Sequence, residues 1–256
     1  MTLILAHLSK FGIIHASDSN LTSSANASAG QGQKTFKLPF LNGGLTIAGA
    51  YSVAGKPMDV WMPNFISAQA SGGVGSLSQF AEALRKRLEA EMDSGEKNSG
   101  SMAHIAGYVE KDGFQHPEFY FIRNVYGISE SNGEYFDVRN QFAVSEDFWN
   151  RDCPKSNVMA AFQSGAYQLY INGFASGRVG YFMLQERMNS FFRAIWEQSQ
   201  WKFRPPQSLA ETVLFVKLYM NVVETLFQVS DYSAPFIGGG CQIHEIPQPT
   251  NTVTRC

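Results

Sequence analysis

The fold is decided at the start of the chain, where residues 2–22 read TLILAHLSKFGIIHASDSNLT. Residues 2–8 and 12–18 are apolar runs rich in β-forming side chains, and a short link with Gly12 at its end separates them. Two such runs around a short glycine-containing link predict a β-hairpin. The chain is therefore expected to begin with two antiparallel strands.

The register of this hairpin follows from its turn. If the turn centres on Lys10 and Phe11, paired residue numbers sum to about 21. Thr2 then lies opposite the residue after Asp18, beside a carboxylate that ends the second strand. Lys34 opens the next predicted strand, and it reaches the same place if that strand joins the hairpin. The sequence thus predicts that Thr2, Asp18 and Lys34 converge.

Such a trio has a chemical use once Met1 is removed, and the small side chain of Thr2 makes that removal plausible. The freed α-amine titrates at a pKa of about 7.7–8.0, so it can act as a base for the Thr2 hydroxyl. A nearby Lys34 ammonium favours the neutral amine, and Asp18 holds that lysine charged. Gly49 is a candidate donor to an oxyanion, because glycine permits close approach of its backbone N–H.

At these residues the sequence resembles the β-type subunits of the proteasome, within the N-terminal nucleophile hydrolase family. Sixteen positions separate Thr2 from Asp18, and sixteen separate Asp18 from Lys34, as in that family. The resemblance implies that Thr2 is the nucleophile, with Asp18 and Lys34 as its charge partners. It also implies that Gly49 serves the oxyanion, although the loop before it is about one residue longer. The stretches that carry the resemblance are Thr2-Leu3-Ile4, Gly12-Ile13-Ile14-His15-Ala16-Ser17-Asp18-Ser19-Asn20-Leu21-Thr22, Lys34-Thr35-Phe36-Lys37-Leu38 and Thr46-Ile47-Ala48-Gly49.

Later residues match the family less closely. Ser164 resembles the serine of its Gly-Ser-Gly helix entry, but Gln163 replaces the first glycine, and Ser164 equally fits a helix N-cap. Asp231 resembles the late aspartate before the last strand, yet it lies several residues too far from the glycines at 238–240, and a structural role also fits it. Asn20 replaces the usual arginine, so details of the substrate pocket do not carry over.

The resemblance implies an α+β fold, a four-layer αββα sandwich in which two antiparallel sheets face each other between helices. We expect one domain over residues 1–256, with extra helix around 178–206 that lengthens the stretch after Ser164. The sequence pattern predicts strands at 2–8, 12–18, 34–38, 45–50, within 102–146 and at 241–246, and a loop at 19–33. It predicts helices at 53–70, 77–92, 178–200 and 208–228, and another that begins at 163–165 after a short apolar run at 157–162.

Composition excludes several classes of protein. Aromatic residues make up 13% of the chain and charged residues only 16%, which excludes intrinsic disorder. A net charge of −2 gives no electrostatic footprint for nucleic acid or an anionic membrane. The apolar stretch 212–227 is broken by charged residues, so no membrane span is expected.

The cysteines and histidines point to neither a metal nor a cofactor. Cys153, Cys241 and Cys256 are widely separated and odd in number, which favours a reducing cytoplasm over a disulfide framework. The five histidines occur singly and are interpreted as ordinary strand residues. The glycine-rich stretches lack the features of a P-loop or a dinucleotide fingerprint.

Together these observations predict a threonine-type N-terminal nucleophile amide hydrolase that acts on peptides and assembles into rings or smaller homo-oligomers. Two alternatives stay open. One is a catalytically inactive scaffold or assembly subunit, which a retained Met1 would favour. The other is an amidase of the same family that acts on a small molecule.

Overall fold

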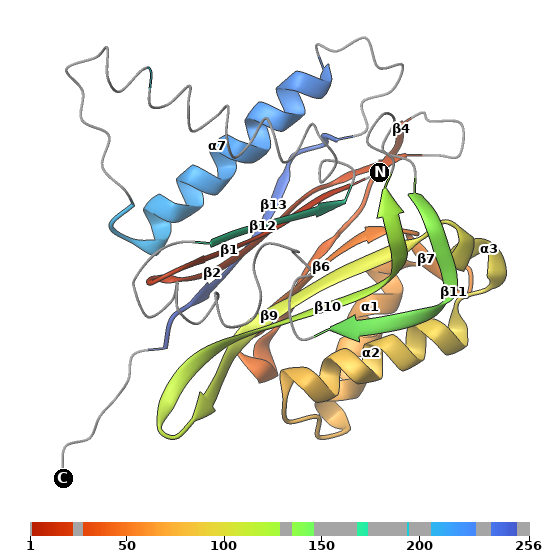
Figure 1. Cartoon of the computed structure of the whole chain (residues 1–256), viewed down its shortest axis with the longest axis horizontal. Coiled ribbons are helices and arrows are strands. Elements are labelled where there is room, and N and C mark those ends of the chain that lie inside the picture. The colour runs from red at the N-terminus through yellow and green to blue at the C-terminus, as the bar shows by residue number, and fades with distance from the viewer. Residues whose placement is uncertain are drawn as a thin grey trace.

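The first hairpin forms the centre of a four-stranded antiparallel sheet in the computed structural model (Figure 1). β1 (Leu3–Ser9) pairs with β2 (Gly12–Asp18), and Ile4 lies opposite Ser17, which confirms the predicted register. β12 (Gln168–Gly173) pairs with β1, and β13 (Cys241–Pro247) pairs with β2. The structure describes residues 2–22, 28–128, 135–145, 168–173, 194, 206–228 and 237–249.

A second antiparallel sheet, of five strands, runs in the order β11-β10-β9-β6-β5. A turn at Asp112 and Gly113 joins its two long strands, and both residues take positive φ angles. A bulge interrupts the pairing of β10 with β11 after Arg123. The strands are β5 (Thr35–Leu38), β6 (Gly43–Gly49), β9 (Ser101–Lys111), β10 (Phe114–Ile128) and β11 (Tyr135–Ser145).

Two of the predicted helices are confirmed, and each begins after a serine that caps it. α2 (Leu77–Glu91) begins after Ser76, whose hydroxyl accepts the backbone N–H of Gln79 at 3.2 Å. α7 (Leu209–Gln228) begins after Ser208, whose hydroxyl accepts a backbone N–H one turn later at 3.2 Å. Short elements that were not predicted include a 3-10 turn (Pro39–Leu41) and α3 (Ser94–Asn98), which starts at a capping box.

Three predictions differ from the structure. The expected loop at 19–33 contains a small two-stranded sheet of β3 (Asn20–Thr22) and β4 (Ser28–Gln31). The helix expected from residue 53 is α1 (Met58–Ser71), which starts after a tight hairpin of β7 (Ser52–Val53) and β8 (Lys56–Pro57).

That hairpin forms because Gly55 and Ala54 take positive φ angles and donate their backbone N–H groups to the Glu96 carboxylate, each at 3.0 Å. The helix expected after residue 165 is also wrong, because residues 168–173 form β12, which satisfies the outer edge of β1. The apolar run at 157–162 and most of the 178–206 region lie outside the described residues.

Alternation along the strands places apolar side chains on both faces of each sheet. The even-numbered residues of β1 pack toward β6, β9 and β10 of the five-stranded sheet, while its odd-numbered ones pack against α7. Helices α1 and α2 cover the opposite face of the five-stranded sheet, as Figure 1 shows. The described chain is therefore a mixed α+β fold with facing antiparallel sheets. β1, buried on both faces, lies at its centre.

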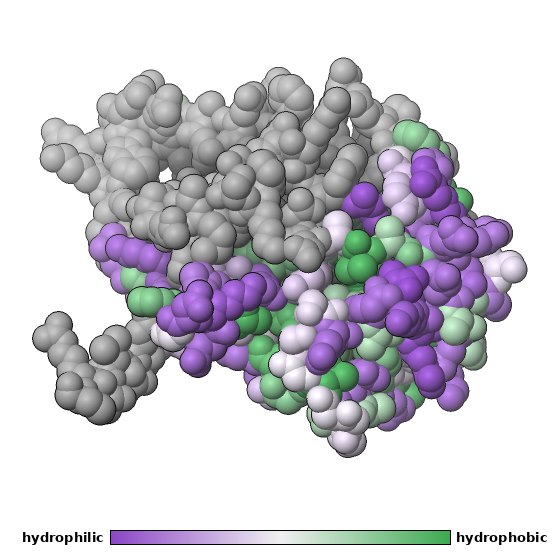
Figure 2. Space-filling view, turned by 60° about the horizontal axis from the view of Figure 1, so that its bottom comes forward, coloured by the Kyte–Doolittle hydropathy of each residue, from purple (hydrophilic) through white to green (hydrophobic). Residues whose placement is uncertain are grey.

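The described surface carries a few large apolar side chains. On the face shown in Figure 2, hydrophilic residues predominate and hydrophobic ones form small groups between them. Among the described residues, no helix combines the length and apolar character that crossing a membrane needs. The large apolar side chains that are more than a third exposed are Val60, Phe114, Phe136, Leu214 and Leu218.

Buried histidines lie on the central strands of both sheets. His15 on β2 and His104 on β9 are fully buried, and His15 Nδ1 lies 3.5 Å from the Thr46 hydroxyl. Burial lowers the pKa of His7 to about 4 and that of His15 to about 3, with the neighbouring His244 adding to the second shift. Burial likewise holds the pKa of His104 well below its usual value. These imidazoles are neutral in the folded protein.

This neutrality predicts acid-labile folding. Between pH 6.5 and about pH 4 the unfolded chain binds protons that the folded histidines reject, so the free energy of unfolding falls as the pH falls. Each such histidine contributes about 1.4 kcal/mol per pH unit. Denaturant titrations at several pH values measure this slope.

His15→Leu is expected to reduce the slope by one histidine's share. Ile13→Val, on the same strand and in the core between the sheets, serves as the control that lowers stability equally at every pH. An unchanged slope in His15→Leu would show that this imidazole does not exclude protons.

Candidate active site

A buried ion pair joins the two sheets at one end of the hairpin. Asp18 is the last residue of β2, and Lys34 directly precedes β5. Lys34 Nζ lies 3.2 Å from Asp18 Oδ2, and the two side chains are 2% and 3% exposed. Nζ also donates to the backbone carbonyl of Asn20 at 2.5 Å. The predicted meeting of Asp18 and Lys34 is present in the structure. The expected route to it is wrong, because the strand after Lys34 is the edge strand of the facing five-stranded sheet and does not join the hairpin.

Asp18 also holds the start of the chain. Its Oδ1 accepts the backbone N–H of Leu3 at 2.8 Å, and its Oδ2 accepts the backbone N–H of Asn20 at 3.2 Å. Thr2, one residue before Leu3, is buried with 3% exposure. The carboxylate therefore binds the peptide N–H that follows Thr2 and the Lys34 ammonium at the same time.

Burial controls the protonation of both charges. It raises the pKa of the Asp18 carboxyl and lowers the pKa of the Lys34 ammonium, while the attraction between the two groups opposes each shift. Lys34 thus releases its proton more readily than a lysine in water.

Hydroxyl groups reinforce the contact between the sheets beside this pair. Ser17 on β2 and Thr35 on β5 approach within 2.8 Å through their hydroxyl oxygens. Lys34 is fixed on the other side as well, because its backbone carbonyl accepts the N–H of Ile47 at 2.9 Å. The position of Lys34 therefore depends on both β2 and β6.

Gly49 ends β6 in a conformation that a side chain would not permit. Its φ angle is +99°, and a Cβ built there would lie 2.1 Å from the carbonyl oxygen of Gly100. The next residue, Ala50, donates its N–H to that carbonyl at 2.8 Å. Gly49 lies two residues beyond Ile47, the residue that binds Lys34, so the predicted oxyanion glycine and the ion pair belong to neighbouring stretches of backbone.

Asn124, which the sequence reasoning missed, supports the turn that Gly49 packs against. It lies in the β10 bulge, is fully buried, and accepts the N–H of Ser101, the ladder partner of Gly49, at 2.7 Å. Its amide donates to the carbonyls of Lys97 and Arg139, each at 2.9 Å. The available signal was a single amide inside an aromatic strand, FYFIRNVY, since a buried amide must find polar partners.

The glycines at 238–240 contact Ser19, the residue that follows Asp18. Ser19 donates its backbone N–H to the carbonyl of Gly238 at 3.1 Å and its hydroxyl to that of Gly239 at 2.6 Å. Gly239 has a φ angle of +78°, and a Cβ there would lie 2.7 Å from the Ser19 hydroxyl. The two remaining predicted site residues, Ser164 and Asp231, lie outside the described residues.

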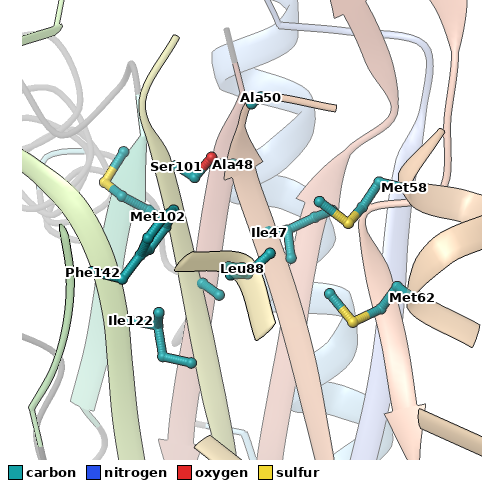
Figure 3. A pocket seen from close by; sticks show the side chains of 11 residues that line it. Ile47, Ala48, Ala50, Met58, Met62, Leu88, Ser101, Met102, Ile122 and Phe142 are labelled. Atoms are coloured by element: carbon teal, nitrogen blue, oxygen red, sulfur yellow. The ribbon is translucent and has the colours of Figure 1, made fainter. Parts of the chain in front are cut away.

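A narrow apolar pocket opens beside Gly49, between β6 and the helices of the five-stranded sheet (Figure 3). Its empty volume is about 300 Å³, part of which is open solvent, and it has room for about one water molecule. Met58 and Met62 of α1 lie on one side, and Met102, Ile122 and Phe142 lie on the other. Within the described residues, no cluster of His, Cys, Asp or Glu has the makings of a metal site.

Comparison with known proteins gives no relative: no family model and no curated protein matches the chain.

The ion pair is expected to show strong coupling in a double-mutant cycle. Asp18→Asn and Lys34→Met each leave one buried charge unpaired, so each is predicted to cost about 3–5 kcal/mol of unfolding free energy. The double variant removes both charges and should cost less than the sum by at least about 1 kcal/mol.

Denaturant unfolding of the four proteins gives the coupling energy. The partly exposed pair of Lys111 and Glu118, whose side chains are 55% and 12% exposed, provides a comparison cycle with an expected coupling below about 1 kcal/mol. Additive costs at Asp18 and Lys34 would contradict the prediction.

Gly49→Ala is predicted to destabilise the protein more than Gly55→Ala. Both glycines have positive φ angles, but a Cβ at Gly55 meets nothing within 4 Å. Gly55→Ala therefore reports conformational strain alone, about 1–2 kcal/mol. Gly49→Ala adds the collision with Gly100 and should cost at least about 2 kcal/mol more. An equal loss of unfolding free energy in the two variants, measured by thermal or denaturant unfolding, would show that the backbone near Gly100 moves aside without a loss of stability.

Proposed function

We propose that this chain is a threonine-type N-terminal nucleophile amide hydrolase, similar to a proteasome β subunit, with Thr2 exposed by removal of Met1. The observation that carries the proposal is the buried pair of Asp18 and Lys34, held against the peptide N–H that follows Thr2. Burying an ion pair costs desolvation free energy, and a function that would explain this pair is to lower the pKa of a terminal amine beside it.

The packing of the described elements supports the four-layer αββα architecture that the resemblance implies. α7 packs on one sheet, the two sheets face each other, and α1 and α2 pack on the outer side of the second sheet. The proposal treats residues 1–256 as one domain of this kind. The ion pair lies where the two central layers meet, which is a suitable place for residues of both sheets to act together.

In the proposed mechanism, Thr2 is both the nucleophile and the base. Its α-amine takes the proton of its hydroxyl as Oγ attacks the substrate carbonyl carbon. The positive charge on Lys34 lowers the pKa of that amine, so more of it is neutral at physiological pH. Asp18 keeps the lysine in place and balances its charge.

The remaining steps complete the acyl transfer. The backbone N–H of Gly49 stabilises the oxyanion that forms when Oγ bonds to the carbonyl carbon. The carbon–nitrogen bond then breaks, the leaving nitrogen receives the proton from the Thr2 amine, and an ester on Oγ remains. Water attacks this ester with the amine again as base, which releases a carboxylic acid and restores Thr2.

Peptides are the proposed substrates. The choice of peptides rests on the resemblance to proteasome β subunits. The proposal also includes a cytoplasmic location and self-assembly. Exposed Leu214 and Leu218 on one side of α7 are apolar groups that a second copy of the chain could cover.

The proposal is tested by the state of the N-terminus. Intact-mass measurement of protein from its native host should show loss of Met1, and an electrophilic probe that reacts with terminal threonine should label Thr2. Thr2→Ala should abolish labelling, and because alanine is also small, Met1 removal should continue. Lys34→Met should slow labelling at least about 100-fold. Thr212→Val, which removes a threonine hydroxyl on α7, is the control that should label normally.

Retention of Met1 in the native host, with no labelling of Thr2, would overturn the hydrolase and favour a scaffold subunit. The burial of Thr2 in the structure is the observation that favours this second candidate. If Thr2 is labelled, digestion of a peptide library and of a panel of small amides separates the peptidase from the small-molecule amidase.

A further inference from the structure

Gln242 on β13 reaches across to the backbone that carries Lys34. Its Oε1 accepts the N–H of Lys34 at 2.8 Å and the N–H of Thr35 at 3.1 Å. Its Nε2 donates to the carbonyl of Gly32 at 2.7 Å. One side chain, 208 positions away in sequence, therefore binds three backbone groups around Lys34.

These three groups lie where the regular pairing of the five-stranded sheet begins. β5 starts at Thr35, and its ladder with β6 begins at the pair of Thr35 and Thr46. The Gln242 amide thus supplies hydrogen bonds at the very end of the sheet. With Ile47 binding the Lys34 carbonyl, both backbone polar groups of Lys34 have a partner.

We propose that Gln242 is a positioning residue for Lys34 in the reaction of Thr2, an inference that rests on the proposed function. The Lys34 side chain must span from its fixed backbone to Asp18 and to the carbonyl of Asn20. A shift of the backbone would withdraw the ammonium from both partners. Gln242 acts on the Thr2 amine only through Lys34.

The chemistry of the three contacts requires an amide. Gln242 accepts two N–H groups with its oxygen and donates to a carbonyl with its nitrogen. A glutamate keeps the acceptor but places a second oxygen against the Gly32 carbonyl. A leucine offers neither group and leaves the partly buried backbone without these partners.

The test compares Gln242→Leu and Gln242→Glu with Glu245→Ala, which alters an exposed side chain on the same strand. The readouts are the rate at which the electrophilic probe labels Thr2 across pH, and thermal unfolding. Gln242→Leu should label at least about 10-fold more slowly, with its acid limb at higher pH, because the Thr2 amine loses the nearby positive charge. The labelling rate of Gln242→Glu should fall between those of Gln242→Leu and the parent protein, and the rate of Glu245→Ala should match that of the parent.

Epistasis separates positioning from a general loss of stability. Adding Gln242→Leu to Lys34→Met should slow labelling no further, because the glutamine acts through that lysine. If Gln242→Leu does not fold, Gln242→Glu carries the same comparison. An unchanged rate and pH profile in a labelled parent protein, or a further loss in the double variant, would overturn the role of Gln242.

Failure of the proposed function looks different, since the parent protein itself is then not labelled at Thr2. Hydrogen exchange of the peptide that contains Lys34 and Thr35 still reports the contact in that case. Faster exchange in Gln242→Leu would show that Gln242 holds this segment, and the missing label would show that no threonine reaction uses it.

Discussion

The ion pair between Asp18 and Lys34 is the constraint on which the arrangement of the two sheets depends. Moving a carboxylate and an ammonium out of water costs several kcal/mol for each ion, so the pair persists only with good geometry and further hydrogen bonds. The structure supplies these from the N–H groups of Leu3 and Asn20 and from the Asn20 carbonyl. Every one of those partners lies at the end of the first hairpin. The pair thus fixes the start of the chain, the end of β2 and the start of β5 relative to one another.

The site lies where regular backbone pairing stops, and amide side chains make up the missing hydrogen bonds. Gln242 binds the backbone at the start of β5, and Asn124 binds the N–H of Ser101, the ladder partner of Gly49. Strand ends and bulges leave N–H and C=O groups without ladder partners, which is why they can be directed toward a ligand or a neighbouring residue. Gln242 holds the backbone that carries Lys34, and Asn124 holds the backbone next to Gly49.

Local patterns allowed much of this site to be predicted. The apolar runs and the short link set the hairpin register. The contact of Asp18 with Lys34 was anticipated by the resemblance, but Lys34 reaches it from the facing sheet, which no local pattern indicated. The supporting residues could not be found in this way, because the partners of Gln242 lie 207 to 210 positions away. The small hairpin before α1 was missed because the Glu96 carboxylate that holds its turn comes from α3. Such contacts follow from the packed fold and leave no periodic signal.

The strand order of the first sheet also has a consequence for biosynthesis. The hairpin of β1 and β2 has both of its neighbours, β12 and β13, more than 140 residues further along the chain. At about 5–20 residues per second, the outer edge of β2 waits on the order of tens of seconds for its partner. During that interval the nascent chain presents an open, apolar strand edge, the kind of surface that chaperones bind. Gln242 lies on β13, so its hydrogen bonds to the backbone of Lys34 and Thr35 can form only after that strand has been synthesised.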